Sequence, residues 1–266
     1  MPQIVRSGCR LSYHLNGNPR GEALLFSNSL GTTHELWDRQ VETLSSAFRI
    51  IRYDTRGHGA SDAPAGSYTI DTLGQDAVAI LDAAGVDHAH VCGLSLGGLT
   101  AMWLGVHAPD RIRSLILSST AARIGSVSMW EERIAQVKAT GVASLADAAM
   151  GRWFTADFRA AQPATVSVYH RLLSSTPAAG YIGCCAAIRD ADLREAIRSI
   201  AAPTLVIAGC VDPVTPPSDA EDIRGRIPGA RAAILDAAHI ANVEQASAFN
   251  DLVSSFITQH RGSVHG

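Results

Sequence analysis

The sequence predicts an α/β fold in which helices flank a mostly parallel sheet. Short apolar runs of strand length alternate along the chain with segments whose apolar residues recur at helical spacing. Strands that alternate with helices need crossover connections, and crossover connections produce parallel pairing. The chain has 266 residues, of which 47% are hydrophobic, so it is long enough to bury one sizeable core.

The predicted strands are the β-rich runs at 10–17, 22–28, 48–54, 88–94, 111–119, 202–209 and 230–237. We expect the first two to form an antiparallel hairpin at the edge of the sheet. Among the helices, the segment from Thr69 to Gly85 has clear ends, because a threonine or an aspartate can cap its start and a glycine follows its last apolar residue.

A helical insertion interrupts the alternation. Residues 122–201 contain no convincing strand and have helical periodicity at 128–141, 144–154, 157–175 and 178–190. We therefore expect a core made of 1–121 and 202–266, with 122–201 as a helical cap over the sheet. The terminal segment 261–266, "RGSVHG", is expected to be frayed.

Charge and composition exclude several classes of partner. The formal net charge of −3 provides no basic face for neutralising many phosphates, so we expect no nucleic-acid partner. Charges interrupt the apolar stretches before they reach bilayer length, and the first residues lack the apolar region of a signal peptide. We expect a cytoplasmic protein without a membrane partner. The oligomeric state stays open, a homo-oligomer included.

The cysteines indicate neither a disulfide framework nor a metal site. An odd number, five, is scattered at positions 9, 92, 184, 185 and 210, without the spacing of zinc ligands. We expect ordinary buried or half-buried thiols, no metal and no cofactor.

One short motif carries chemistry. In "HVCGLSLGGLTAM" the segment from Gly93 to Gly97 has the pattern G-x-S-x-G, and it follows a predicted strand and precedes a predicted helix. That context is typical of a nucleophile elbow, in which glycines permit a sharp turn that exposes the serine hydroxyl. The alternative is a plain glycine-rich turn. We favour Ser95 as a nucleophile.

A serine nucleophile needs a base and an orienting acid, which for this motif follow it in the order acid, then histidine. Asp212 comes directly after the predicted strand 202–209, and His239 comes after the strand 230–237. The carboxyl ends of parallel strands share one edge of the sheet, so both can reach Ser95. Asp236 is a rival acid, but it lies only three residues before His239, and we favour Asp212.

The negative charge that develops on the reacting carbonyl oxygen needs N–H donors. One is the backbone N–H of Leu96, which follows the nucleophile, and the other is the backbone N–H of Leu30, in the loop after the strand 22–28. In that loop Asn28 or Ser29 could instead cap a turn.

The stretch "YDTRGHGASD" also contains polar groups, Arg56 and His58 among them. We interpret both as structural, with a carboxylate holding Arg56. The role of His34, just beyond the loop with Leu30, stays open.

These motifs together resemble the α/β-hydrolase superfamily over essentially the whole chain. "SNSLGTTHELWDRQV", "YDTRGHGASDAPAGSYTI", "GLSLGGLTAMWLG", "STAARIGS", "MWEERIAQV" and "WFTADF" more narrowly resemble the 3-oxoadipate enol-lactonases of protocatechuate and catechol degradation. In that comparison, Asn28-Ser29 stands where such hydrolases often carry His-Gly. The resemblance implies an α/β-hydrolase fold with a cap, and hydrolysis of a small anionic enol lactone to 3-oxoadipate without a cofactor.

A desolvated substrate carboxylate needs a cation or several polar donors. The candidates in the insertion are Arg133, ranked first, and then Arg123 and Arg152, with Trp130, Trp153 and Tyr181 as pocket walls. Each has a plainer interpretation, as a surface arginine or as packing between cap and sheet. Two other functions remain open: a general small-ester esterase or perhydrolase, which a neutral pocket would favour, and a ligand sensor without turnover.

Overall fold

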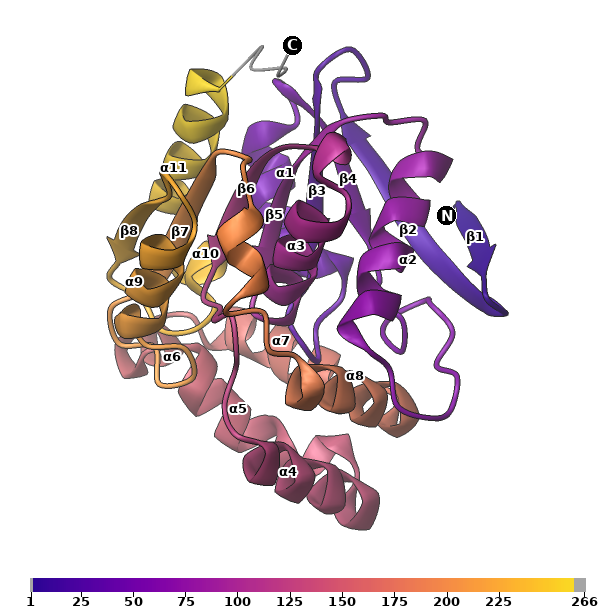
Figure 1. The fold of residues 1–266 in the computed structure, drawn as a ribbon. Coiled ribbons are helices and arrows are strands. Elements are labelled where there is room, and N and C mark those ends of the chain that lie inside the picture. Colours follow the sequence, from indigo (N-terminus) through magenta and orange to yellow (C-terminus); the bar gives the residue numbers. More distant parts are fainter. Residues whose placement is uncertain (1, 261–266) are drawn as a thin grey trace.

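The computed structural model describes residues 2–260, and these contain an eight-stranded sheet (Figure 1). Its spatial order is β1-β2-β4-β3-β5-β6-β7-β8. All pairs from β4 to β8 are parallel, whereas β2 pairs antiparallel with both β1 and β4. The α/β class with a mostly parallel sheet is thus confirmed. The strands are β1 (Gln3–Arg6), β2 (Cys9–Gly17), β3 (Glu22–Ser27), β4 (Phe48–Tyr53), β5 (Ala89–Leu94), β6 (Ile112–Ser118), β7 (Thr204–Gly209) and β8 (Arg231–Leu235).

The expected hairpin between 10–17 and 22–28 is wrong in its pairing. β2 pairs with β1, a four-residue strand that we did not predict, while β3 lies between β4 and β5 in parallel register. The reason is burial: β3 is buried from Ala23 to Ser27 without alternation, as expected for a strand covered on both faces. Although β3 follows β2 directly in the sequence, burial on both faces places it in the middle of the sheet, between β4 and β5.

Helices cover both faces of the sheet. In Figure 1, α2 (Ile70–Ala83), α3 (Leu96–His107) and α9 (Pro217–Arg226) lie in front of it, while α1 (Asp38–Leu44) and α11 (Ala246–Gln259) lie behind it and contact each other. The short α10 (Ala241–Glu244) leads into α11. The predicted ends of α2 are confirmed, because the Thr69 hydroxyl accepts from the Thr72 N–H and Gly85 has a φ of +63°.

The stretch 119–203, all of it described, contains no strand. Its helices are α4 (Val127–Thr140), α5 (Ala146–Trp153), α6 (Ala156–Ala161), α7 (Pro163–Ser174) and α8 (Ala178–Asp190), and they form a layer below the sheet in Figure 1. The helix expected at 157–175 is divided in two, because Pro163 lacks an N–H and begins α7. The cap boundaries, 122 and 201, stay a prediction.

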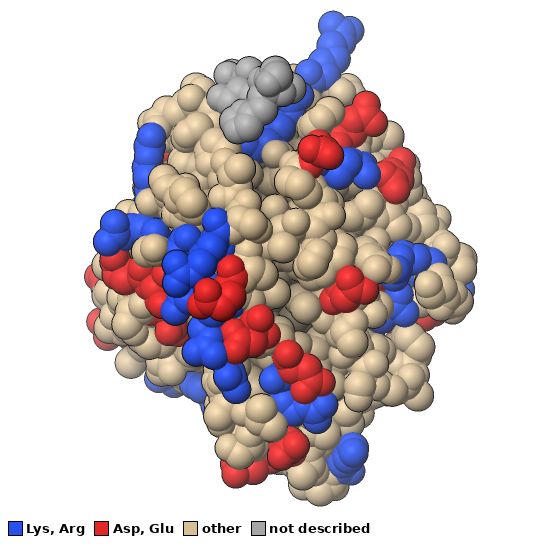
Figure 2. All heavy atoms as spheres, viewed as in Figure 1, with Lys and Arg blue, Asp and Glu red and all other residues tan. Residues whose placement is uncertain are grey.

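Four other expectations concern membrane-spanning helices, surface charge, the thiols and the terminal segment. No helix within 2–260 is long and apolar enough to cross a bilayer. Basic and acidic side chains are intermingled on the face that Figure 2 shows. All five thiols are free and four are buried, but Cys210 is exposed, contrary to expectation. The tail 261–266, expected to be frayed, lies outside the described residues.

Candidate active site

Ser95 occupies a strained turn between β5 and α3. Its φ of +56° lies in the left-handed region, which non-glycine residues rarely adopt. Hydrogen bonds fix this conformation: the Ser95 N–H donates to the Ser118 carbonyl at 3.0 Å, and the Ser95 carbonyl accepts from the Thr120 hydroxyl at 2.8 Å. Although Ser95 precedes α3, its hydroxyl does not cap the helix, so the Oγ atom is available for chemistry.

The two outer glycines of the motif are required because backbone carbonyl groups lie too close to them for a side chain. A Cβ atom on Gly93 would lie 2.1 Å from the Gly97 carbonyl oxygen, and one on Gly97 would lie 2.0 Å from the Ser27 carbonyl oxygen. No side chain fits at either position without movement of the backbone. The elbow predicted from the sequence is therefore present in the structure.

His239 and Asp212 form a buried hydrogen-bonded pair. The Nδ1 atom of His239 lies 2.8 Å from Oδ2 of Asp212. Asp212 also accepts hydrogen bonds from the N–H groups of Val214 and Thr215 and from the Thr215 hydroxyl. Burial alone would raise the pKa of Asp212, but the His239 charge and these donors outweigh it and lower the pKa. The carboxylate therefore stays ionised and holds His239 at Nδ1, so Nε2 is the ring nitrogen on the opposite edge of the imidazole.

The rival acid Asp236 is turned away from His239. Its side chain is exposed, and its carboxylate accepts from the Cys210 thiol at 3.3 Å. The structure thus brings Asp212, and not Asp236, to the histidine. Thr215 was missed in the sequence, where "DPVTPP" gave no reason to single it out.

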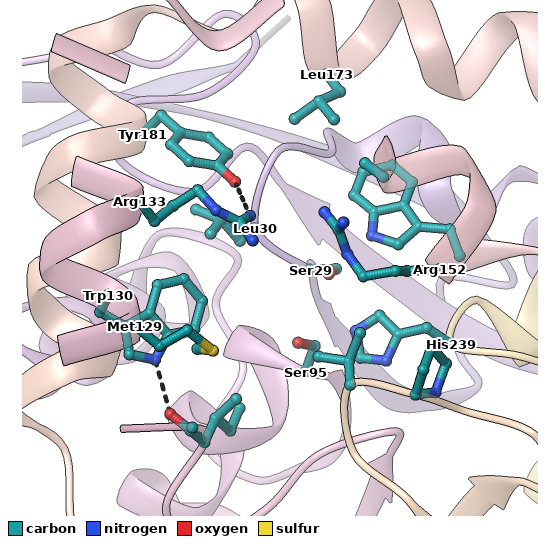
Figure 3. A pocket seen from close by; sticks show the side chains of 16 residues that line it. Ser29, Leu30, Ser95, Met129, Trp130, Arg133, Arg152, Leu173, Tyr181 and His239 are labelled. Carbon is teal, nitrogen blue, oxygen red and sulfur yellow. Dashed lines mark hydrogen bonds between the residues drawn. The ribbon is translucent and has the colours of Figure 1, made fainter. Parts of the chain in front are cut away.

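A cavity of about 160 Å³ opens between the carboxyl edge of the sheet and the cap helices. Ser95 and His239 lie at one end of it in Figure 3, and Tyr181 and Leu173 lie at the other. Its lining residues are Ser29, Leu30, Ser95, Ile124, Gly125, Met129, Trp130, Arg133, Ala149, Arg152, Trp153, Leu173, Tyr181, Pro213, Val214 and His239.

Two of the three candidate arginines line this cavity. The guanidinium groups of Arg133, from α4, and Arg152, from α5, point into it from opposite sides in Figure 3. Arg133 Nη1 donates to the Tyr181 hydroxyl at 3.4 Å. The structure does not bring Arg123 to the cavity, because its exposed side chain lies 3.4 Å from the Asp192 carboxylate and lines a separate surface depression.

The predicted aromatic walls all line the cavity. Trp130 is anchored by its indole N–H, which donates to the Ile124 carbonyl at 2.7 Å, and Trp153 and Tyr181 are buried. Sequence reasoning missed Met129 and Leu173. They are apolar residues on cap helices, and nothing in the sequence separates them from ordinary packing residues.

The loop after β3 brings Leu30 to the cavity, close to the start of α3. Leu30 lines the cavity, and Leu96 is the first residue of α3, where backbone N–H groups lack helical partners. Asn28 does not reach the cavity, because its amide donates to the Tyr53 carbonyl and accepts from the Trp37 indole. Ser29 does line it.

Arg56 and His58 lie outside the cavity lining. Arg56 makes two hydrogen bonds of 2.8 Å to the Asp76 carboxylate on α2, which confirms the expectation that a carboxylate holds it. The side chain of His58 is fully buried, and its Nε2 accepts from the Gly31 N–H at 2.9 Å.

His34, whose role the sequence left open, belongs to a cluster with His14 and Asp54. Within 2–260 they form the one group of three histidine, cysteine or acidic side chains whose possible metal-ligand atoms all lie within 4.8 Å of one another. The imidazole rings are stacked with centroids 3.7 Å apart, so their in-plane lone pairs do not converge on one point. Asp54 already accepts from the His34 N–H, the His34 ring and the Ala60 N–H. The geometry therefore does not fit a metal ion, and we assign none.

Known protein families and relatives resemble the chain over most of its length. The family model described as the alpha/beta hydrolase fold matches residues 22–246. The chain belongs to the α/β hydrolase fold family. This hydrolase is 41% identical over 252 residues to 3-oxoadipate enol-lactonase 1 of Acinetobacter baylyi, covering 95% of the chain and 94% of the relative. It is 42% identical to 3-oxoadipate enol-lactonase 2 of the same species, covering 92% of each.

A solved structure has the same architecture. The enol-lactonase from Burkholderia xenovorans superposes on the hydrolase with a TM-score of 0.95 and 41% identity, covering 97% of this chain and 100% of the other. The similarity thus includes the cap helices as well as the sheet.

Proposed function

We propose that this hydrolase is a serine-dependent lactonase that converts 3-oxoadipate enol-lactone to 3-oxoadipate. The relatives named for this activity match more than nine-tenths of the chain, cap included. The proposal extends to a role in aromatic-compound degradation, to the cytoplasmic location expected from the sequence, and to the division into a core and a cap.

In the proposed mechanism Ser95 Oγ attacks the lactone carbonyl, and His239 takes the hydroxyl proton at Nε2. Because Nδ1 of His239 is held by Asp212, the tautomer and the ring orientation are fixed before substrate arrives. The backbone N–H groups of Leu30 and Leu96 stabilise the oxyanion of the tetrahedral intermediate.

Collapse of that intermediate breaks the ester bond and expels an enolate, which is a better leaving group than an amine. His239 returns the proton, and the enol becomes the ketone. Water, activated by the same histidine, then hydrolyses the acyl-enzyme and releases 3-oxoadipate with both carboxylates free. Ser95, His239 and Asp212, together with the two backbone N–H groups and water, supply the nucleophile, the base and the oxyanion donors that these steps require.

The observation that carries the substrate assignment is the position of Arg133 and Arg152 in the same cavity as Ser95 and His239. The substrate bears one carboxylate outside the lactone ring. Guanidinium groups bind carboxylates with charge-assisted hydrogen bonds, which are stronger than neutral ones. A neutral ester gains nothing from this pair, so the cavity favours an anionic substrate.

The test is a turnover assay on purified protein with the enol lactone and a panel of neutral p-nitrophenyl esters. We expect kcat/KM to be highest for the lactone, and Ser95→Ala to abolish turnover while the variant stays folded. A serine-directed phosphonate should label Ser95 in the unmodified protein. Preference for neutral esters would instead indicate an esterase or perhydrolase, and lactone binding without turnover would indicate a sensor.

A further inference from the structure

The loop with Leu30 is held by hydrogen bonds on both sides of that residue. Ser29, Leu30 and Gly31 follow β3. The peptide unit before the Leu30 Cα contains the Ser29 carbonyl and the Leu30 N–H, and the unit after it contains the Leu30 carbonyl and the Gly31 N–H. Each of these units is bonded to a buried side chain that does not line the cavity.

Thr32 holds the first peptide unit. Its hydroxyl donates to the Ser29 carbonyl at 2.8 Å, and its backbone N–H donates to the same oxygen at 3.2 Å. In a planar trans peptide the carbonyl and the N–H point in opposite directions. By fixing the Ser29 carbonyl, Thr32 therefore fixes the direction in which the Leu30 N–H points.

His58 holds the second unit. Its Nε2 accepts from the Gly31 N–H at 2.9 Å, and its Nδ1 lies 3.3 Å from the Arg56 carbonyl, so the ring proton resides on Nδ1. Burial lowers the pKa of His58 to about 4. The ring is thus neutral at physiological pH, and Nε2 is available as an acceptor.

The loop that carries His58 is itself rigidly placed. A Cβ atom on Gly57 would lie 2.4 Å from the Gly180 Cα of the cap helix α8, and the His58 N–H donates to the Thr55 carbonyl at 2.8 Å. On the other side, a Cβ on Gly31 would lie 2.4 Å from Leu173 Cδ1. The Leu30 loop is therefore fitted between His58 and the cap.

We propose that Thr32 and His58 are positioning residues that orient the Leu30 N–H toward the oxyanion. This inference rests on the proposed function, in which that N–H is a donor. It gives the motif "YDTRGHGASD" a part in catalysis without contact with substrate. Because all esters share the same oxyanion site, the effect should appear with any ester that the enzyme hydrolyses.

The experiment compares Thr32→Val with Thr204→Val. Both threonines are buried, and both donate a hydroxyl hydrogen bond to a nearby carbonyl, but Thr204 lies at the amino end of β7, opposite the site. We expect Thr32→Val to lower kcat about 10- to 100-fold, while KM stays within about threefold of its original value. This fall in kcat is smaller than the one expected from losing a whole oxyanion donor. Thr204→Val should leave kcat unchanged, and Thr32→Ser, which retains the hydroxyl, should recover most of it.

His58 is tested with His58→Gln and His58→Leu. The glutamine carbonyl can take the place of Nε2 as an acceptor, whereas leucine cannot, so the kcat of His58→Gln should exceed that of His58→Leu by about tenfold. Equal losses in these two variants would overturn the role of His58. A Thr32→Val enzyme with unchanged kcat, or one that matches Thr204→Val, would overturn the role of Thr32.

Failure of the proposed function would look different. The unmodified enzyme would then fail to hydrolyse the lactone, while the ratios of kcat between variants could still be measured on p-nitrophenyl acetate. If Thr32→Val or His58→Leu does not fold, Thr32→Ala and His58→Ala take their places, because they also remove the hydrogen bond but add no apolar bulk. Thr32→Ser and His58→Gln, which retain the bond, should have nearly full kcat and remain the variants against which the loss is measured.

Discussion

Arg133 and Arg152 direct two positive charges into one cavity from different helices. Within 2–260, neither guanidinium has a carboxylate partner; Arg133 contacts the Tyr181 hydroxyl. Burial and the neighbouring Arg133 charge lower the pKa of Arg152, since each of them disfavours its positive charge. A carboxylate bound between the two guanidinium groups would relieve this repulsion, which is why the proposed function assigns an anionic substrate to this cavity.

The first prediction concerns selectivity. Arg133→Ala and Arg152→Ala should each lower kcat/KM for the enol lactone by about 10- to 100-fold, since a hydrogen bond to a charged group contributes about 1.5–3 kcal/mol. Activity on a neutral p-nitrophenyl ester should change by less than about threefold, because that reaction uses the same Ser95 and oxyanion donors without the contact. Steady-state kinetics on both substrates measures the difference.

Arg123→Ala is the matched control, because it removes a cap arginine that lies outside the cavity. It should change neither activity. Equal losses on both substrates in the cavity variants would assign those arginines a structural role, and no loss in either would contradict the anion site.

The second prediction separates the two acids near His239. Asp212→Asn should lower kcat by about 10⁴-fold, because the amide no longer stabilises the imidazolium or selects the tautomer. Asp236→Asn should stay within about threefold of the original kcat, since its carboxylate is exposed and bonds to Cys210. If Asp236→Asn is the more damaging change, the acid has been wrongly assigned.

The sequence predicted where Ser95, Asp212 and His239 lie better than it predicted the strand pairing at the edge of the sheet. Ser95, Asp212 and His239 follow strands, and parallel strands bring their carboxyl ends to one edge, so strand order along the chain was enough to bring these residues together. The pairing of β2 needed more, because antiparallel contact with β4 depends on which strands the core buries.

The cap was the hardest part to predict. Its helices show amphipathic periodicity, but the periodicity does not tell which face meets the cavity, so Arg123 was grouped with Arg133 and Arg152. An ion pair with Asp192, 69 residues further along the chain, was invisible in the sequence. The contact between His58 and Gly31 joins residues 27 positions apart, and the contact between Thr32 and Ser29 depends on the turn that this loop forms. Neither contact could be predicted from the sequence.

The third prediction concerns the thiols. Cys210 is exposed, whereas Cys9, Cys92, Cys184 and Cys185 are buried. The pKa of Cys210 is raised, as are those of the four buried thiols, so solvent access and not acidity separates Cys210 from the others. A disulfide reagent at pH 8 should therefore modify one thiol quickly in the folded protein and all five in urea. Cys210→Ser should remove the fast phase. A second fast thiol in that variant would show that one of the four is accessible.

The last prediction concerns stability and the buried carboxylate of Asp76. This carboxylate accepts hydrogen bonds from Arg56 and from Arg6, and both Asp76 and Arg56 are buried. Asp76→Asn removes the negative charge and leaves the Arg56 guanidinium buried without compensation, which should lower the free energy of unfolding by about 3–5 kcal/mol. Urea denaturation measures this loss.

The control is Glu221→Gln, which breaks an exposed ion pair with Arg224 and should lower the free energy of unfolding by less than about 1 kcal/mol. If the two variants lose similar stability, the Arg56–Asp76 pair does not contribute in the way that its burial implies, and the loop with His58 must be held chiefly by its glycine contacts with the cap.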